Sequence, residues 1–138
     1  MTDTEIIEQF ERGRAPGESF HHADHVRVAF AYLVRYSFLD AVERFCSALK
    51  RFALAHGKPG LYHETITWAY LFVIRERLAR VGQSLNWEEF AEQNPDLLVW
   101  NEGVVQRAYR KETLASDLAR SVFVFPDAFD AADAVGRG

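Results

Sequence analysis

The sequence predicts an all-α fold, a single compact helical bundle of five to six helices. Three observations support this prediction. Apolar residues recur at helical spacing along most of the chain. Turns that contain Gly or Pro separate these stretches, and no internal repeat or low-complexity linker divides them. Because 138 residues is a common size for one core, we expect one all-helical domain over residues 1–130 and a frayed C-terminal tail over residues 131–138.

The composition is that of a chain that folds without cross-links. Apolar residues make up 49% and aromatic residues 14% of it, well above the content of a disordered chain. The formal net charge is −4 with both signs interspersed, which argues against a nucleic-acid partner. Cys46 is the one cysteine, so an internal disulfide and a Cys-rich zinc site are excluded. The longest apolar run, residues 68–74, is too short to span a bilayer and no secretory pattern precedes it, so we expect a cytoplasmic protein with no membrane partner.

Apolar stripes and the residues that bound them predict the first two helices. The first helix is expected over residues 5–11, with Thr4 as its candidate N-cap and Gly13 after its end. The second is expected to begin near residues 20–23, after a candidate cap at Ser19. Its inward stripe consists of Val26, Ala29, Phe30 and Leu33.

The middle of the chain predicts two long helices and a short one. Residues 39–56 are amphipathic and end before a glycine, and residues 62–81 are apolar on nearly every face, which predicts a central helix. A short helix over residues 87–93 follows. Asn86 and Glu89 have the spacing of a capping box at its start.

The last third of the chain predicts short elements. Residues 104–110 and 114–120 are expected to be short helices, with Ser116 as a natural cap, and residues 122–125 are an apolar extended segment without a pairing partner. Arg120 is a candidate either to clamp an anion or to tie this tail to the bundle.

Four of the five histidines lie beside two predicted helix starts. His21, His22 and His25 are at the start of the second helix, and His63 is at the start of the fourth. At about 100° per residue, His22 falls inside the apolar stripe and His21 falls well outside it. His22 and His25 are three residues apart and project from one side of the helix within a turn. We therefore expect His22, His25 and His63 to point inward.

Three neutral imidazoles from two packed helices would form a three-nitrogen site with an open position for a divalent metal ion, namely zinc, iron or copper. The prediction is a metal-dependent enzyme that acts on a small-molecule substrate. Glu64 is the candidate general base, and Tyr62 and Thr67 are the candidate hydroxyl donors to a bound water or substrate. Asp24 would orient a histidine or favour the first helical turn. Zinc would favour hydrolysis, and iron or copper would favour oxidation.

A non-catalytic helical binding module is the alternative prediction. The histidines would then serve as helix caps and core hydrogen-bond groups, and the protein would bind a protein partner or an apolar ligand. Capping by His22 or Asp24, and pairing of His63 with Glu64 or a carbonyl, would explain the cluster. Whether the apolar excess also forms a homo-oligomer interface is left open by the sequence.

Three segments resemble, in order, the motifs of a family of small uncharacterised bacterial proteins. The family motifs are His-x-x-His-[Val/Leu], Tyr-His-x-Thr and a closing Ala-Arg followed by Phe-Val-x-Pro-Asp. The matching segments are Phe20-His21-His22-Ala23-Asp24-His25-Val26-Arg27, Tyr62-His63-Glu64-Thr65-Ile66-Thr67, and Tyr109 through Ala119-Arg120 to Phe123-Val124-Phe125-Pro126-Asp127. The resemblance spans nearly the whole chain and implies functional positions at His22, His25, His63 and Thr67. Phe125 stands where the family often has an acidic residue, and no activity is assigned to the family, so the resemblance implies a site but no reaction.

Overall fold

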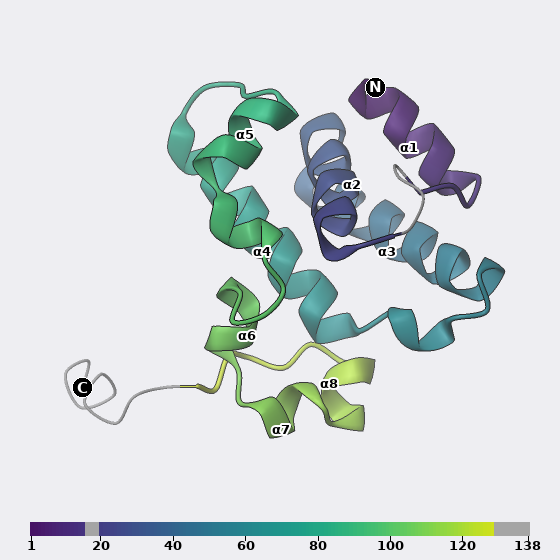
Figure 1. Ribbon diagram of the computed structural model, residues 1–138, viewed down its shortest axis with the longest axis vertical. Helices are drawn as coiled ribbons and strands as arrows, with labels where there is room; N and C mark the ends of the chain where they lie inside the picture. Colours follow the sequence, from purple (N-terminus) through teal and green to yellow (C-terminus); the bar gives the residue numbers. More distant parts are fainter. Residues whose placement is uncertain (16–19, 129–138) are drawn as a thin grey trace.

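The computed structural model describes residues 1–15 and 20–128, and in these ranges the protein is all-α, as the sequence predicts (Figure 1). The described residues form eight α-helices and two 3-10 helices and contain no strand. The elements are α1 (Asp3–Glu11), α2 (His22–Arg35), α3 (Phe38–Ala55), η1 (Pro59–Leu61), α4 (Glu64–Val81), α5 (Trp87–Gln93), η2 (Pro95–Leu98), α6 (Val104–Ala108), α7 (Lys111–Leu114) and α8 (Asp117–Ser121). The predicted tail over residues 131–138 and the candidate cap Ser19 lie outside the described residues.

The most deeply buried helix is α2. It packs against α1, α3, α4 and η2, and every residue from 26 to 33 is buried. The sequence predicted this central place for α4, but Phe72 of α4 is 42% exposed, so one face of that helix is only partly covered. Instead, α4 contacts both α2 and α3 and the C-terminal helices α6 and α8. No helix in the described ranges is long and apolar enough to cross a membrane.

Local capping chemistry decides where two of the helices begin. The α1 helix starts after Thr2 rather than after the predicted cap Thr4, because Glu5 lies three residues after Thr2 and completes a capping box. The Thr2 hydroxyl accepts the Glu5 amide at 3.1 Å and the Glu5 carboxylate accepts the Thr2 amide at 3.1 Å. The predicted capping box of Asn86 and Glu89 is confirmed at the start of α5.

The helix predicted over residues 114–120 begins later, as α8, and a separate short helix, α7, ends at Leu114 before it. Ser116 lies between them as the N-cap of α8. Its hydroxyl donates to the Thr113 carbonyl at 2.6 Å and accepts the Ala119 amide at 3.1 Å. These bonds end one helix and start the next, so Ser116 is a cap, as predicted, but in the middle of the predicted helix.

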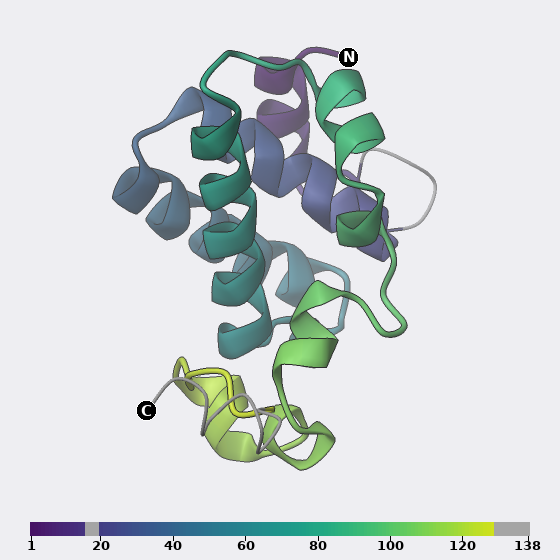
Figure 2. The same cartoon turned by 90° about the vertical axis from the view of Figure 1, so that its left-hand side faces the viewer.

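The apolar segment 122–125 is extended, as predicted, and a side chain supplies its backbone partner. The hydroxyl of Thr65, which is fully buried in α4, donates to the Val122 carbonyl at 2.9 Å and accepts the Val124 amide at 3.1 Å. The Tyr109 hydroxyl donates to the Val124 carbonyl at 2.6 Å. These bonds hold the chain that follows α8 near the first turn of α4, and Figures 1 and 2 both place α7 and α8 at this end of the molecule.

Replacing Thr65 with Val is expected to lower the free energy of unfolding by about 1–3 kcal/mol, because it leaves the partly buried Val122 carbonyl and Val124 amide without these partners at nearly constant volume. Urea denaturation followed by circular dichroism measures the change. The matched control is Thr4→Val on the exposed face of α1. Equal stability of Thr65→Val and the parent would show that the hydroxyl does not hold the segment.

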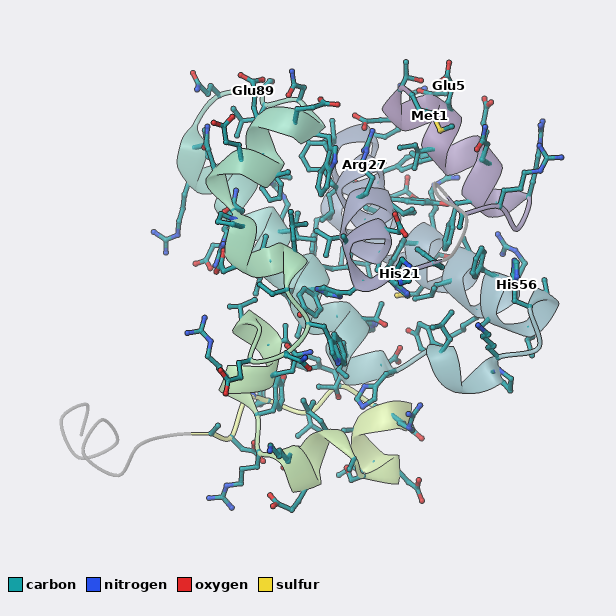
Figure 3. All side chains as sticks on the ribbon, viewed as in Figure 1. Met1, Glu5, His21, Arg27, His56 and Glu89 are labelled. Atoms are coloured by element: carbon teal, nitrogen blue, oxygen red, sulfur yellow. The ribbon has the colours of Figure 1, made fainter. Side chains whose placement is uncertain are left out.

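Arg27 ties the opposite end of the molecule together. Figure 3 shows it on α2, and its guanidinium donates to the Asp3 carboxylate of α1 at 2.7 Å. The same group lies 5.3 Å from the ring centroid of Trp87 in α5. Arg27 is buried, and this ion pair and the aromatic contact compensate its charge. Arg27 therefore links α1, α2 and α5 at this end of the molecule.

Candidate functional site

The protein contains a mostly apolar cavity of about 480 Å³, within the usual range for small-molecule pockets. The cavity lies among α2, α3 and α4, and η1, the chain after η2 and the end of α8 complete its wall. Its described lining consists of Phe20, His22, His25, Val26, Ala29, Phe45, Leu49, Gly60, Leu61, His63, Ile66, Thr67, Tyr70, Trp100 and Arg120. The three histidines singled out in the sequence, together with Thr67, therefore share one cavity.

His63 joins the start of α4 to the C-terminal helices. It is the N-cap of α4, with extended backbone, and is therefore not inside the helix as its sequence position suggested. Its Nδ1 accepts the Ile66 amide at 3.1 Å, and its Nε2 lies 2.8 Å from the Leu114 carbonyl oxygen. Because a carbonyl only accepts, Nε2 carries the proton and donates, and Nδ1 holds the lone pair. Both ring nitrogens of this buried histidine are thus engaged.

His22 is fixed by one backbone carbonyl and two aromatic rings. Its Nε2 donates to the Leu97 carbonyl of η2 at 2.9 Å, which leaves the lone pair on Nδ1. Its ring centroid lies 4.8 Å from that of Tyr70 and 5.3 Å from that of Trp100. The imidazole is therefore held between α4 and the chain after η2.

His25 is held by stacking and not by hydrogen bonds. Its ring lies parallel to that of Phe20, with centroids 4.0 Å apart and an interplanar angle of 8°. Neither of its ring nitrogens has a hydrogen-bond partner among the described residues. Burial, with a smaller contribution from nearby His22, lowers the pKa of His25 to about 4. Burial also lowers the pKa of His22 and His63, so all three rings are neutral at neutral pH.

The two other histidines lie away from the cavity. His21 is the N-cap of α2 and is exposed, as its position outside the apolar stripe predicts. The Asp24 carboxylate accepts the His21 backbone amide at 3.0 Å, so Asp24 supports the first turn of α2. His56 follows the end of α3, where its Nε2 lies 2.8 Å from the Gly13 carbonyl oxygen. Figure 3 shows His21 and His56 at separate places on the molecule.

Thr67 and Arg120 add polar groups to the cavity wall. The Thr67 hydroxyl has no hydrogen-bond partner within the described ranges. Arg120 donates from Nη1 to the carbonyl oxygens of Gly60 at 3.0 Å and Tyr62 at 3.4 Å, which fixes its guanidinium over the chain that leads into α4. Its Nε and Nη2 donate to no other described residue and it forms no ion pair with one. It is the one charged side chain in the described lining.

Tyr62 and Glu64, two of the three predicted catalytic residues, are not among the residues that line the cavity. The Tyr62 hydroxyl donates to the Glu64 carboxylate. The Lys50 ammonium lies 4.8 Å from the Tyr62 ring centroid. Cys46 of α3 is buried, and burial raises the pKa of its thiol, so it packs as a small apolar side chain. Tyr62 therefore contacts Lys50 of α3 and Glu64. Of the three predicted catalytic residues, only Thr67 lines the cavity with the histidines.

In the part of the chain that the structure describes, no group of three or more His, Cys, Asp or Glu side chains is arranged to hold a metal ion. His63 supplies part of the physical reason. A metal ligand must present a lone pair, and the lone pair of His63 accepts the Ile66 amide. Its ring would have to give up the helix cap to join His22 and His25 around one ion. The structure therefore brings the three histidines to one cavity but not into one coordination sphere.

Sequence reasoning missed the contribution of the chain after η2. Trp100 lines the cavity and the Leu97 carbonyl orients His22, and both lie more than seventy positions from that histidine in the sequence. Nothing local marks either residue as part of a site, because a backbone carbonyl has no sequence signature and Trp100 lies in a loop. Tyr70, which lies in the predicted central helix over residues 62–81, lines the cavity as well.

The resemblance of the histidine motifs to a bacterial family gains no support from comparison with known proteins. No family model matches the chain. No curated protein and no solved structure shows significant similarity to it. The function must therefore be argued from the cavity itself.

Proposed function

We propose that this protein binds a small, largely apolar organic molecule in the histidine-lined cavity. The observation that carries the proposal is the cavity, about 480 Å³ in volume, with a mostly apolar wall and a few polar groups at fixed positions. His22 and His63 are held rigid by backbone carbonyls, whereas His25 and Thr67 keep hydrogen-bonding capacity. Such a site can bury an apolar body and orient it by one or two polar contacts.

The size of the cavity favours a ligand over a packing defect. Protein interiors are close-packed, and each void of methyl size or more costs stability because the surrounding atoms lose contacts. A space of about 480 Å³ is far larger than a water-sized void, and its wall is mostly apolar. Water in the apolar part of this space would find few polar partners. An apolar occupant would restore the missing contacts.

The proposal predicts that N-phenyl-1-naphthylamine, a neutral dye that fluoresces in apolar surroundings, binds the purified protein at one site. Ala29→Leu is expected to weaken this binding at least tenfold, because Ala29 lines the cavity and three added carbon atoms occupy part of it. Trp100→Ala is expected to weaken it several-fold, because the indole is part of the wall. Fluorescence titration measures both effects.

Ala23→Leu is the matched control for the Ala29 variant. It makes the same change on an exposed position of α2 that does not line the cavity, and it should bind the dye like the parent. Circular dichroism shows whether each variant is folded. Absence of saturable dye binding, or equal binding by the parent, Ala29→Leu and Trp100→Ala, would contradict the proposal.

A metal-dependent enzyme that acts on a small molecule is our second proposal. The observation that favours it is that three neutral histidines, His22, His25 and His63, line one cavity, and His22 Nδ1 and both nitrogens of His25 are not engaged by the described residues. Two imidazole lone pairs are thus left unused by the described residues. The third would become available only if His63 left its capping position, which makes this proposal structurally more demanding than the first.

The second proposal requires near-stoichiometric zinc, iron or copper in the purified, untagged protein after dialysis without chelator. The metal should be lost from the His22→Ala, His25→Ala double variant, and elemental analysis measures it. A His21→Ala variant is the control, because that ring lies outside the cavity. If the parent stays free of metal after incubation with each ion, the three histidines are not a metal centre.

A further inference from the structure

We propose that the ligand is an amphipathic monocarboxylate whose carboxylate binds Arg120 and whose apolar body fills the cavity. The inference rests on the proposed function, since it needs the cavity to be a ligand site, and it names the chemical class of that ligand. The observation behind it is that Arg120 combines a fixed position, a full charge and unused donors in the wall of a neutral cavity.

The first step concerns the charge of the wall. Among the described lining residues there is no Asp or Glu, and the three histidines are neutral because burial lowers their pKa. Arg120 therefore supplies a net positive charge to the site. The guanidinium also contributes to the lowered pKa of His63, which lines the same cavity. A site of this charge attracts anions and repels cations.

The second step concerns the hydrogen bonds of Arg120. Bonds from Nη1 to the carbonyls of Gly60 and Tyr62 fix the guanidinium plane. The donors on Nε and Nη2 are left without a described partner, and they form one edge of the planar group. That edge matches the two oxygens of a carboxylate, which arginine binds through two parallel hydrogen bonds.

The third step concerns α4, whose N-terminal end lies at the same place. Arg120 bonds to the Tyr62 carbonyl two residues before the helix begins, and the positive end of the helix dipole favours an anion there. Glu64 in the first turn opposes this effect. Its carboxylate accepts the Tyr62 hydroxyl, however, and does not line the cavity.

The fourth step limits the ligand to one charge. Arg120 is exposed at the edge of the cavity, whereas the rest of the described wall is apolar or neutral. A second carboxylate placed inside would be buried without a charged partner, which is strongly unfavourable. A ligand with one carboxylate matches Arg120 at the edge, and its hydrocarbon or aromatic body matches the neutral interior of the cavity.

The experiment compares decanoate with decan-1-ol, which has the same chain without the charge, as competitors of N-phenyl-1-naphthylamine. On the parent protein, decanoate is expected to displace the dye at a concentration about tenfold lower than decan-1-ol. Arg120→Gln is expected to weaken the binding of decanoate about tenfold and to leave the binding of decan-1-ol within twofold of that of the parent. Arg120→Lys should keep part of the preference, because the charge remains but the two-bond geometry is lost.

Lys111→Gln is the matched control, since it removes one positive charge from neighbouring α7 without touching the cavity wall. Both probes should displace the dye from this variant at the same concentrations as from the parent protein. Equal displacement by decanoate and decan-1-ol, or an unchanged preference in Arg120→Gln, would overturn the inference while leaving the ligand site intact. If the parent protein binds neither the dye nor either probe, the proposed function is overturned as well.

Discussion

Replacing His63 with Ala is expected to lower the free energy of unfolding by about 2–3 kcal/mol. The change removes the ring that caps α4 at the Ile66 amide, and loss of an N-cap costs about 1 kcal/mol. It also leaves the Leu114 carbonyl without its donor, at a further cost of about 1–2 kcal/mol. Urea denaturation measures the total. The contact between α4 and the C-terminal helices should loosen first, because Leu114 is the end of α7.

His63→Asn separates the two roles of this residue. Asn is a preferred N-cap, so it should restore the bond to Ile66 and recover about 1 kcal/mol relative to His63→Ala. The Asn side chain is too short to reach Leu114 as the imidazole does, so the remaining loss should persist. A His63→Ala protein as stable as the parent would mean that neither bond contributes to stability, and the histidine would then be free to serve as a ligand.

The free energy of unfolding is expected to fall by up to about 3 kcal/mol between pH 6.5 and pH 4 through His25 alone. Its pKa is about 4 in the folded protein, against the ordinary value of 6.5 that applies to the unfolded chain. Below pH 6.5 the unfolded chain therefore binds a proton that the folded protein does not, and stability falls until the folded ring also titrates near pH 4. The lowered pKa values of His22 and His63 act in the same direction.

His25→Phe tests this origin, because a neutral ring of similar shape can keep the stacking on Phe20. The stability of the variant should depend less on pH between 6.5 and 4 than that of the parent. Asp96 and Asp127 also have lowered pKa values, through hydrogen bonds from Arg77 and Thr113, and they act in both proteins. The difference between the two urea-denaturation profiles therefore isolates His25. Parallel profiles would show that the pKa of His25 is not lowered in the folded protein.

The sequence predicted most of the helices because their signals are local. Apolar spacing of 3.6 residues indicated α2 and α3, and an Asn and a Glu three residues apart indicated the start of α5. The errors were local as well. Thr2 competed with Thr4 as the cap of α1, and capping by Ser116 delayed the start of the helix predicted over residues 114–120 to Asp117.

The site was predictable only in part. The helical position of His22 indicated an inward ring and that of His21 an exposed one, and the structure agrees for both. The three-nitrogen metal site was predicted from residue types alone. That prediction could not foresee that the backbone carbonyls of Leu97 and Leu114 bind His22 and His63. Those carbonyls decide which ring nitrogen carries the proton, and hence which lone pairs are available.

Local sequence patterns were sufficient to predict the helical class, the different exposure of His21 and His22, and the placement of four histidines beside the starts of α2 and α4. These features depend on contacts within a few residues, which periodicity and capping rules describe. Three other features became visible only in the folded chain: His63 caps α4 and bonds to α7, Thr65 holds the extended segment, and Arg120 completes the wall of an apolar cavity. Each of these contacts joins residues more than fifty positions apart or uses a backbone atom, and neither leaves a pattern in the order of the amino acids.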